Sequence, residues 1–147
     1  MPHVIIYTDG GAAPNPGLGG WAAVLYSPEH DKKLEIYGAE PNTTNNRMEL
    51  LAAIKALKAL KFSCEVDLHT DSSYLHNAFN KGWLKNWQKN NWRTSTGGQV
   101  LNQDLWQELI KLTRTHKIKW HWVKGHADDE INNRCDELVQ IARNEFI

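Results

Sequence analysis

Cysteine is scarce in this sequence, and long apolar runs are absent. Only Cys64 and Cys135 occur among 147 residues, far apart and without the Cys/His spacing of tetrahedral zinc, so neither a disulfide framework nor a zinc site is indicated. No apolar run approaches the ~20 residues that span a bilayer, and the start at Met1 lacks a basic leader and a cleavage site. These absences predict a cytoplasmic protein with inert thiols and no membrane association.

Acidic residues are missing from one stretch, although Lys+Arg and Asp+Glu number 17 each over the chain. Between Ser72 and Gln103 there is no Asp or Glu, while cations alternate with tryptophans: Lys81, Trp83, Lys85, Trp87, Lys89, Trp92 and Arg93. Aromatic rings beside basic groups suit the bases or sugars of a nucleic acid and its phosphates. An amphipathic helix with core tryptophans explains the pattern equally well.

Apolar spacing and turn residues predict an α/β domain. The apolar share of 41% fits one globular domain over residues 1–147. The predicted strands are Val4–Thr8, Trp21–Tyr26, Leu34–Ala39, Glu65–Thr70 and Ile118–Val123, and the predicted helices are Asn46–Leu60, Ser72–Phe79, Gly82–Lys89, Leu101–Leu112 (with Leu101 inward) and Asn132–Asn144. The first three strands read as an antiparallel meander. Right-handed strand–helix–strand units then add parallel strands, giving a mixed sheet with helices on its faces.

Two predicted strands end alike, in Thr8-Asp9-Gly10 and Thr70-Asp71-Ser72. If these strands are parallel neighbours, their backbones lie ~4.8 Å apart and both carboxylates face one cleft at the carboxyl ends of the strands. An isolated Asp at such a place more often caps the following turn or helix. Only the presence of two further acids, Glu49 and Asp136, favours a shared site.

Glu49 and Asp136 each have an ordinary explanation as well. Glu49 follows Asn46 by three residues, as the partner in a capping box does. Asp136 falls in the apolar frame of the last helix, where an acid is rare unless paired or metal-bound, although spacing alone also allows a surface position. If all four acids converge, divalent cations must relieve their repulsion. His126 is in a loop ten residues before Asp136; such a histidine is usually a surface residue, but over carboxylates it can move protons.

In this order and spacing the motifs resemble type 1 ribonuclease H, closest to its compact bacterial members. The matching stretches are Tyr7-Thr8-Asp9-Gly10, Asn15-Pro16-Gly17, Thr43-Thr44-Asn45-Asn46-Arg47-Met48-Glu49-Leu50, Thr70-Asp71-Ser72, Trp120 to His126, and Arg134-Cys135-Asp136-Glu137-Leu138. The resemblance implies an α/β, ribonuclease H-like fold, a five-stranded mixed sheet flanked by helices on both faces, in a single catalytic domain.

The resemblance also implies an activity and a cofactor. It implies an endonuclease that hydrolyses the RNA strand of RNA/DNA hybrids and leaves 5′-phosphate and 3′-hydroxyl ends. Asp9, Glu49, Asp71 and Asp136 would hold two Mg²⁺ ions, with Mn²⁺ as a substitute, because these ions prefer hard oxygen ligands. His126 would assist proton transfer or product release. A monomer without an obligatory protein partner is expected.

Substrate contacts follow from the same resemblance. Asn15, Asn45 and Glu49 would lie along the RNA strand, which the 2′-hydroxyl distinguishes; Thr44 and Asn86 would grip a DNA phosphate, Trp83 would pack on DNA sugars, and Lys85, Lys89 and Arg93 would meet phosphates. Each has an ordinary alternative, as turn, cap, solvated or core residue. The uncharged loop Thr94–Gly98 contrasts with the lysine-rich loop of some relatives. We therefore expect weaker hybrid binding with a shallower salt dependence.

Two other functions compete with hydrolysis of hybrids. A hybrid-binding module without chemistry would have lost one or more acids, and all four are present. Another nuclease or an integrase-like nucleotidyl transferase can use the same sheet. The segment from Thr43 to Glu49 and the Trp83 segment argue against that alternative, since they match hybrid recognition.

Overall fold

The computed structural model describes residues 1–94, 96–123 and 130–146. In chain order the elements are β1 (His3–Ala12), β2 (Gly17–Ser27), β3 (Lys32–Thr43), α1 (Asn45–Lys58), β4 (Glu65–Thr70), α2 (Ser73–Asn80), α3 (Trp83–Lys89), α4 (Gln103–Thr115), β5 (Lys117–Trp122) and α5 (Glu130–Phe146). The strands form one five-stranded sheet in the order β3-β2-β1-β4-β5. β1, β2 and β3 pair antiparallel, and β4 pairs parallel with both β1 and β5. The predicted mixed sheet and its opening meander are confirmed.

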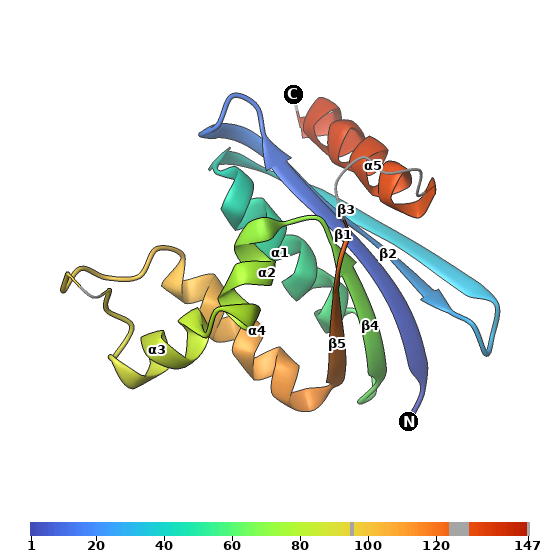
Figure 1. Ribbon diagram of the computed structural model, residues 1–147. Helices are drawn as coiled ribbons and strands as arrows, with labels where there is room; N and C mark the ends of the chain where they lie inside the picture. The colour runs from blue at the N-terminus through green and yellow to red at the C-terminus, as the bar shows by residue number, and fades with distance from the viewer. Residues whose placement is uncertain (95, 124–129, 147) are drawn as a thin grey trace.

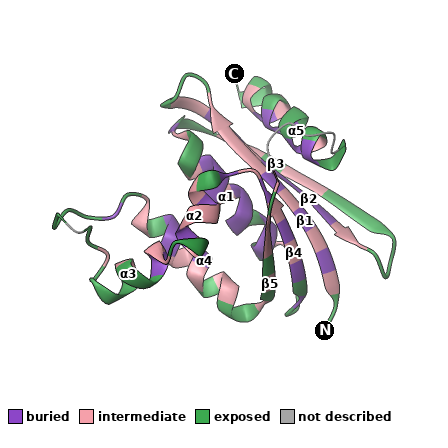
Figure 2. Ribbon diagram, viewed as in Figure 1, coloured by how far each residue is buried: buried purple, intermediate pink, exposed green. Residues whose placement is uncertain are grey.

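Helices cover both faces of this sheet (Figure 1). The larger core lies between the sheet and α1, α2 and α4, where the inner face of α1 is fully buried (Figure 2). On β1 and β4 every second residue enters this core, as the two-residue period of a strand requires. A smaller core lies under α5, which packs its Cys135, Leu138 and Val139 against β2. The intervening residues of β1 and β4 therefore face the same side of the sheet as α5.

Strand β1 is longer than the sequence predicted. It continues past Thr8 to Ala12, because its pairing with β2 runs on to Ala12 opposite Gly19 after its pairing with β4 has ended at Tyr7 opposite His69. Asp9 therefore lies within a strand that has lost one neighbour. A strand that is paired on only one side leaves room for side chains at that edge.

Helix α1 begins one residue earlier than predicted. Its N-cap is Thr44, whose Oγ1 accepts a hydrogen bond from the backbone N–H of Arg47 at 3.2 Å. The capping-box partner of Thr44 would be Arg47 and not Glu49, so the capping explanation of Glu49 is wrong. The carboxylate of Glu49 is available for another role.

Helix α4 also differs from its prediction. It begins at Gln103, after Asn102 in the left-handed region (φ 62°), so Leu101 precedes the helix and is 79% exposed rather than inward. Leu105, Trp106 and Leu109 are buried as predicted. Among the described residues, no helix combines the length and apolarity needed to cross a membrane.

Candidate active site

Asp9 and Asp71 lie side by side because β1 and β4 are parallel neighbours. Tyr7 pairs with His69 in the last register position of the two strands, and each Asp stands two residues further along. Thr8 and Thr70 are buried in the main core, so the alternation of each chain turns its Asp to the opposite face. The prediction that these two acids share one cleft is confirmed.

Glu49 joins them from α1 through a close approach between backbones. The N-terminal part of α1 passes over Gly10, where an added Cβ would lie 2.5 Å from the carbonyl oxygen of Met48 and 2.7 Å from the backbone nitrogen of Glu49. Glycine is therefore required at this position. The Gly10 N–H donates to Asp9 Oδ1 at 2.9 Å and to Glu49 Oε1 at 3.2 Å. Carboxylate oxygens of Asp9, Glu49 and Asp71 all lie within 4.8 Å of one another.

Asp136 approaches from the other face on α5. This helix sits close on β2, where a Cβ at Gly20 would lie 2.7 Å from the carbonyl oxygen of Val139. Asp136 lines the same cleft as the three clustered acids, and its negative charge raises the pKa of Asp9. The side chain is exposed, so the surface position that the sequence allowed is the one observed.

The three clustered acids repel one another in a poorly solvated place. Burial, then the charge of Asp71, raises the pKa of Asp9 to about 7, against a smaller lowering by the Gly10 N–H. Burial raises the pKa of Glu49 well above its usual value, and the charges of Asp9 and Asp71 add to this. Glu49 Oε2 is buried without a hydrogen-bond partner among the described residues. An orphaned buried oxygen within a set of hard oxygen donors fits a divalent cation.

The cleft around the acids has a volume of about 380 Å³ and a largely polar lining. Besides the four acids and Ser73, it includes side chains that the sequence had not indicated: Tyr74, Gln140 and Arg143. Gln140 and Arg143 follow Asp136 by four and seven residues on α5, the spacing of one helix face. That periodicity was the signal in the sequence that could have identified them.

The candidate RNA-side residues stand at one rim of this cleft. Asn45 lines it, and its Oδ1 accepts the Ala12 N–H at 2.7 Å. The backbone N–H of Asn45 in turn donates to Asn15 Oδ1 at 3.1 Å. Both amides are exposed. These two hydrogen bonds tie the β1–β2 connection to the start of α1. Thr44 is the helix cap described above.

The segment of tryptophans and cations forms a separate hollow of about 390 Å³ around α3. Its lining residues are Trp83, Asn86, Trp87, Asn90, Arg93 and Thr94. Lys85 and Lys89 are exposed on the same helix. Trp83, Trp87 and Trp92 are half-buried and pack on the edge of the main core, so both interpretations of this segment hold in part. Asn86 lies in this hollow. The amide of Asn102, which the sequence did not indicate, also meets the first turn of α1, where its Oδ1 accepts from Arg47 at 3.2 Å.

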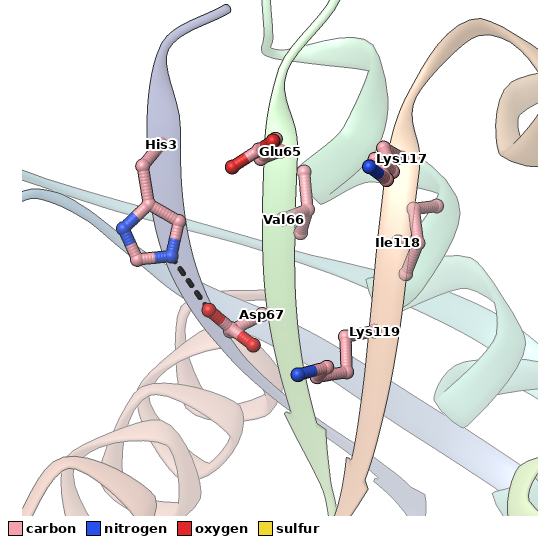
Figure 3. A pocket seen from close by; sticks show the side chains of 7 residues that line it. All are labelled: His3, Glu65, Val66, Asp67, Lys117, Ile118 and Lys119. Carbon is pink, nitrogen blue, oxygen red and sulfur yellow. Dashed lines mark hydrogen bonds and ion pairs between the residues drawn. The ribbon is translucent and has the colours of Figure 1, made fainter.

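Another hollow of about 380 Å³ lies at the opposite ends of β1, β4 and β5 (Figure 3). Here Asp67 accepts from His3 Nε2 and from His121 Nε2, each at 2.6 Å, and these hydrogen bonds lower the pKa of Asp67. Asp67 therefore has protein partners for both oxygens, unlike Glu49. The orphaned oxygen and the mutual repulsion that indicate a cation belong to the first cleft.

His126, predicted to stand over the acids, lies outside the described residues.

Comparison with known proteins agrees with this geometry. The family model of RNase H matches residues 1–144. A ribonuclease H of Caldanaerobacter subterraneus is 60% identical over 136 residues, which cover 92% of this chain and 88% of that protein. A ribonuclease H of Chlorobaculum parvum is 55% identical over 139 residues, covering 95% of this chain and 94% of that protein.

Solved structures agree as well. LC9-RNase H1, described as a type 1 RNase H with the type 2 active-site motif, superposes with a TM-score of 0.86 at 27% identity, covering 99% of this chain and 74% of that chain. LC11-RNase H1 in complex with an RNA/DNA hybrid shares the fold, with a TM-score of 0.73 at 23% identity, covering 97% of this chain and 98% of that chain.

Proposed function

This chain belongs to the ribonuclease H family and hydrolyses the RNA strand of RNA/DNA hybrids, and we propose that it does so at the cleft formed by Asp9, Glu49, Asp71 and Asp136. The observation that carries this assignment is the convergence of three carboxylates from β1, β4 and α1 within 4.8 Å. Such a cluster is stable at neutral pH only when cations or protons neutralise it. The products would carry 5′-phosphate and 3′-hydroxyl ends.

The donor set fits a pair of Mg²⁺ ions, for which Mn²⁺ can substitute. When bound, two such ions supply a nucleophilic water and stabilise the charge that develops on the phosphate oxygens. Burial, and then the charges of Asp71 and Asp136, raise the pKa of Asp9, so Asp9 would be a ligand of both ions. Glu49 and Asp71 would then hold the ion on the leaving-oxygen side, and Asp136 the ion on the water side.

The protein's other residues would select and orient the hybrid. Asn45, which lines the cleft, and Asn15, which accepts the Asn45 N–H, would present their amides to the 2′-hydroxyl groups that distinguish RNA. Trp83 and Asn86, in the hollow around α3, would meet the sugars and a phosphate of the DNA strand, with Thr44 contributing to the phosphate contact. Lys85, Lys89 and Arg93 would neutralise phosphates nearby. His126 would assist proton transfer or product release.

We propose further that the protein acts as a cytoplasmic monomer on this substrate. All four acids of the cleft come from one chain, so no second subunit is needed to complete the site. A single catalytic domain spanning the chain accounts for both the cleft and the hollow around α3. Sedimentation of the protein at micromolar concentration tests the oligomeric state.

Labelled RNA/DNA hybrid, RNA duplex and DNA duplex, each incubated with Mg²⁺ or with a chelator, test the function. We expect cleavage only of the RNA strand of the hybrid and only with Mg²⁺. Asp9→Asn and Asp71→Asn should abolish turnover, and His126→Ala should only slow it. Glu65→Gln, at the far end of β4 from Asp71, is the matched control and should keep full activity.

Two results would contradict this assignment. Hybrid binding without cleavage would leave a binding module in place of an enzyme. Equal loss of activity in Asp9→Asn, Asp71→Asn and His126→Ala would refute the proposed ranking of the residues, because a proton-transfer aid should contribute less than the ligands of the ions.

A further inference from the structure

Helix α5 presents a stripe of polar side chains to the cleft. Asp136, Gln140 and Arg143 all line it, and their spacing of four and three residues places them on one face of the helix. Asp136 is already assigned to the ions. Gln140 and Arg143 extend the same surface by two turns, which is about 10 Å along the helix axis.

Arg143 differs from the other arginine of α5 in its partners. Arg134 is bound by Glu35 and by Glu137, whereas Arg143 makes no ion pair among the described residues. Its Nη2 instead donates to the neutral Oε1 of Gln140 at 2.9 Å. Within the described part of the chain, no carboxylate forms an ion pair with this guanidinium, and its remaining donors are available to a ligand.

The stem of Arg143 is held in place by the sheet. A Cβ added to Gly20 of β2 would lie 3.1 Å from Arg143 Cγ, so the aliphatic part of the side chain rests directly on the glycine backbone. The residue is half-buried and lines the cleft. A guanidinium that is oriented in this way loses little side-chain entropy when it binds an anion.

We propose that Arg143 binds a phosphate of the RNA strand, one or two nucleotides from the scissile phosphate. This inference rests on the proposed function, since it needs the RNA strand in the acidic cleft. The strand that is cut must pass the acids, and Arg143 lines the same cleft. Helix α3, whose residues line the other hollow, lies far from α5, with α1 and α2 between them (Figure 1), so its cations would serve the other strand.

Gln140 is a positioning residue in this arrangement. Its Oε1 accepts one guanidinium N–H and aims the others, without adding a negative charge that would compete with phosphate. Planar Arg–phosphate pairs are commonly bidentate, which fixes geometry as well as adding affinity. The contact would add to the affinity for the RNA strand without touching the reacting phosphate.

The test compares Arg143→Gln, Arg143→Lys and a control, Arg114→Gln, on intact hybrids at several salt concentrations. Arg114 is exposed in the last turn of α4 and lies outside the cleft. For Arg143→Gln we expect KM to rise about tenfold with kcat nearly unchanged, and the slope of log kcat/KM against log salt to become shallower by about 1. The KM of Arg143→Lys should lie between those of the wild type and Arg143→Gln, because lysine keeps the charge but lacks the planar guanidinium.

Hybrids with one uncharged methylphosphonate linkage identify the phosphate. Scanning the linkage along either strand should reveal one RNA-strand position at which wild type and Arg143→Gln have equal KM, because the contact is already lost. The inference is overturned if Arg143→Gln keeps the wild-type KM and salt slope, or if the equalising position lies in the DNA strand. It is also overturned if kcat and melting temperature fall together in both Arg143 variants, which indicates a structural role. Absence of cleavage by the wild type would instead refute the proposed function.

Discussion

Asp9 and Glu49, forty residues apart in sequence, accept hydrogen bonds from one and the same backbone N–H, that of Gly10, at 2.9 and 3.2 Å. A single N–H cannot balance two negative charges in a buried setting. Burial, and then repulsion between the acids, raises the pKa of each carboxyl, that of Asp9 to about 7. The cleft is therefore built to take up positive charge, as a proton at low pH or as a cation at higher pH.

The metal-free protein should lose stability as pH rises. The folded state binds the Asp9 proton more tightly than the unfolded state, since the folded pKa of about 7 exceeds the usual 3.8. That stabilisation is present below pH 4 and is lost as pH rises to about 7. In chelator, we expect Asp9 alone to contribute a fall of about 2–4 kcal/mol in the free energy of unfolding across this window. Urea unfolding at a series of pH values measures it.

Asp9→Asn provides the control for this pH dependence. The variant removes the raised pKa, so its metal-free stability at pH 8 should exceed that of the wild type and vary less between pH 4 and pH 8. Mg²⁺ should stabilise the wild type at pH 8 and the variant much less, because ligands must be deprotonated and present to bind. An equal change in stability between pH 4 and pH 8 for wild type and Asp9→Asn in chelator contradicts the interpretation.

Gly10→Ala should misplace Glu49. The added Cβ would lie 2.7 Å from the backbone nitrogen of Glu49, so α1 must move away from β1. We expect a loss of about 1–3 kcal/mol in the free energy of unfolding and a fall in kcat of about 100-fold. Gly11→Ala is the matched control, because its Cβ would meet only Asn45 Oδ1 at an ordinary 3.5 Å. Equal activity of the two variants would show that the close approach is not needed.

The sequence was sufficient to place Asp9 and Asp71, because both depend on local signals. Alternation of apolar residues fixed the faces of β1 and β4, and parallel neighbours put their carboxyl ends together. Glu49 was ambiguous, since its spacing from Asn46 also matched a capping box. In the structure the cap of α1 is Thr44, two residues before Asn46, so Glu49 is not part of a capping box. The sequence alone does not distinguish these two positions of the cap.

Features that depend on tertiary contact were not predictable. β1 extends to Ala12 because of its pairing with β2, and Leu101 is exposed because Asn102 adopts a left-handed conformation before α4. Arg143 was overlooked for another reason. An arginine on a helix is usually solvated, and only the packing of its stem on Gly20 shows that this one is oriented.

Arg134 and Glu35 should hold Asp136 in place. Arg134, two residues before Asp136 on α5, donates from Nε at 2.8 Å and from Nη2 at 3.1 Å to the carboxylate of Glu35 on β3. The ion pair is bidentate but partly exposed to solvent. Because solvent screens it, we expect Arg134→Met to lower the free energy of unfolding by only about 1 kcal/mol. Its effect on kcat should be larger, about tenfold, since a small shift of α5 moves a catalytic carboxylate.

A double-mutant cycle with Glu35→Gln measures this coupling. The two single variants and the double variant should show similar kcat, because each removes the same link between α5 and β3. Glu137→Gln is the control: it removes only the exposed bond from Arg134 Nη1 within α5 and should leave kcat unchanged. Additive effects on kcat in the cycle would contradict a shared positioning role.

Removal of charge from α3 should weaken binding of the hybrid without affecting chemistry. Lys85 and Lys89 are exposed on this helix and make no ion pair among the described residues. Each Lys→Gln change should raise KM, leave kcat unchanged and reduce the salt slope by about 0.9 if one phosphate contact is lost. Lys33→Gln, at the distant β2–β3 end, is the control. An unchanged salt slope in both α3 variants would exclude them from the phosphate contacts.

Addition of charge to the neighbouring loop should strengthen binding. The loop Thr94–Gly98 carries no charge, which leads us to expect a shallow salt dependence. Gly98 accepts a side chain, since its Cβ would meet only Thr94 Oγ1 at 3.6 Å, whereas Gly97 has φ 90° and would be strained. Gly98→Lys should therefore lower KM and steepen the salt slope by about 0.9. Gly98→Gln adds a side chain of similar size without charge and should change neither KM nor the salt slope. If both variants behave alike, the loop does not face a phosphate, and the weaker binding expected from its composition has another cause.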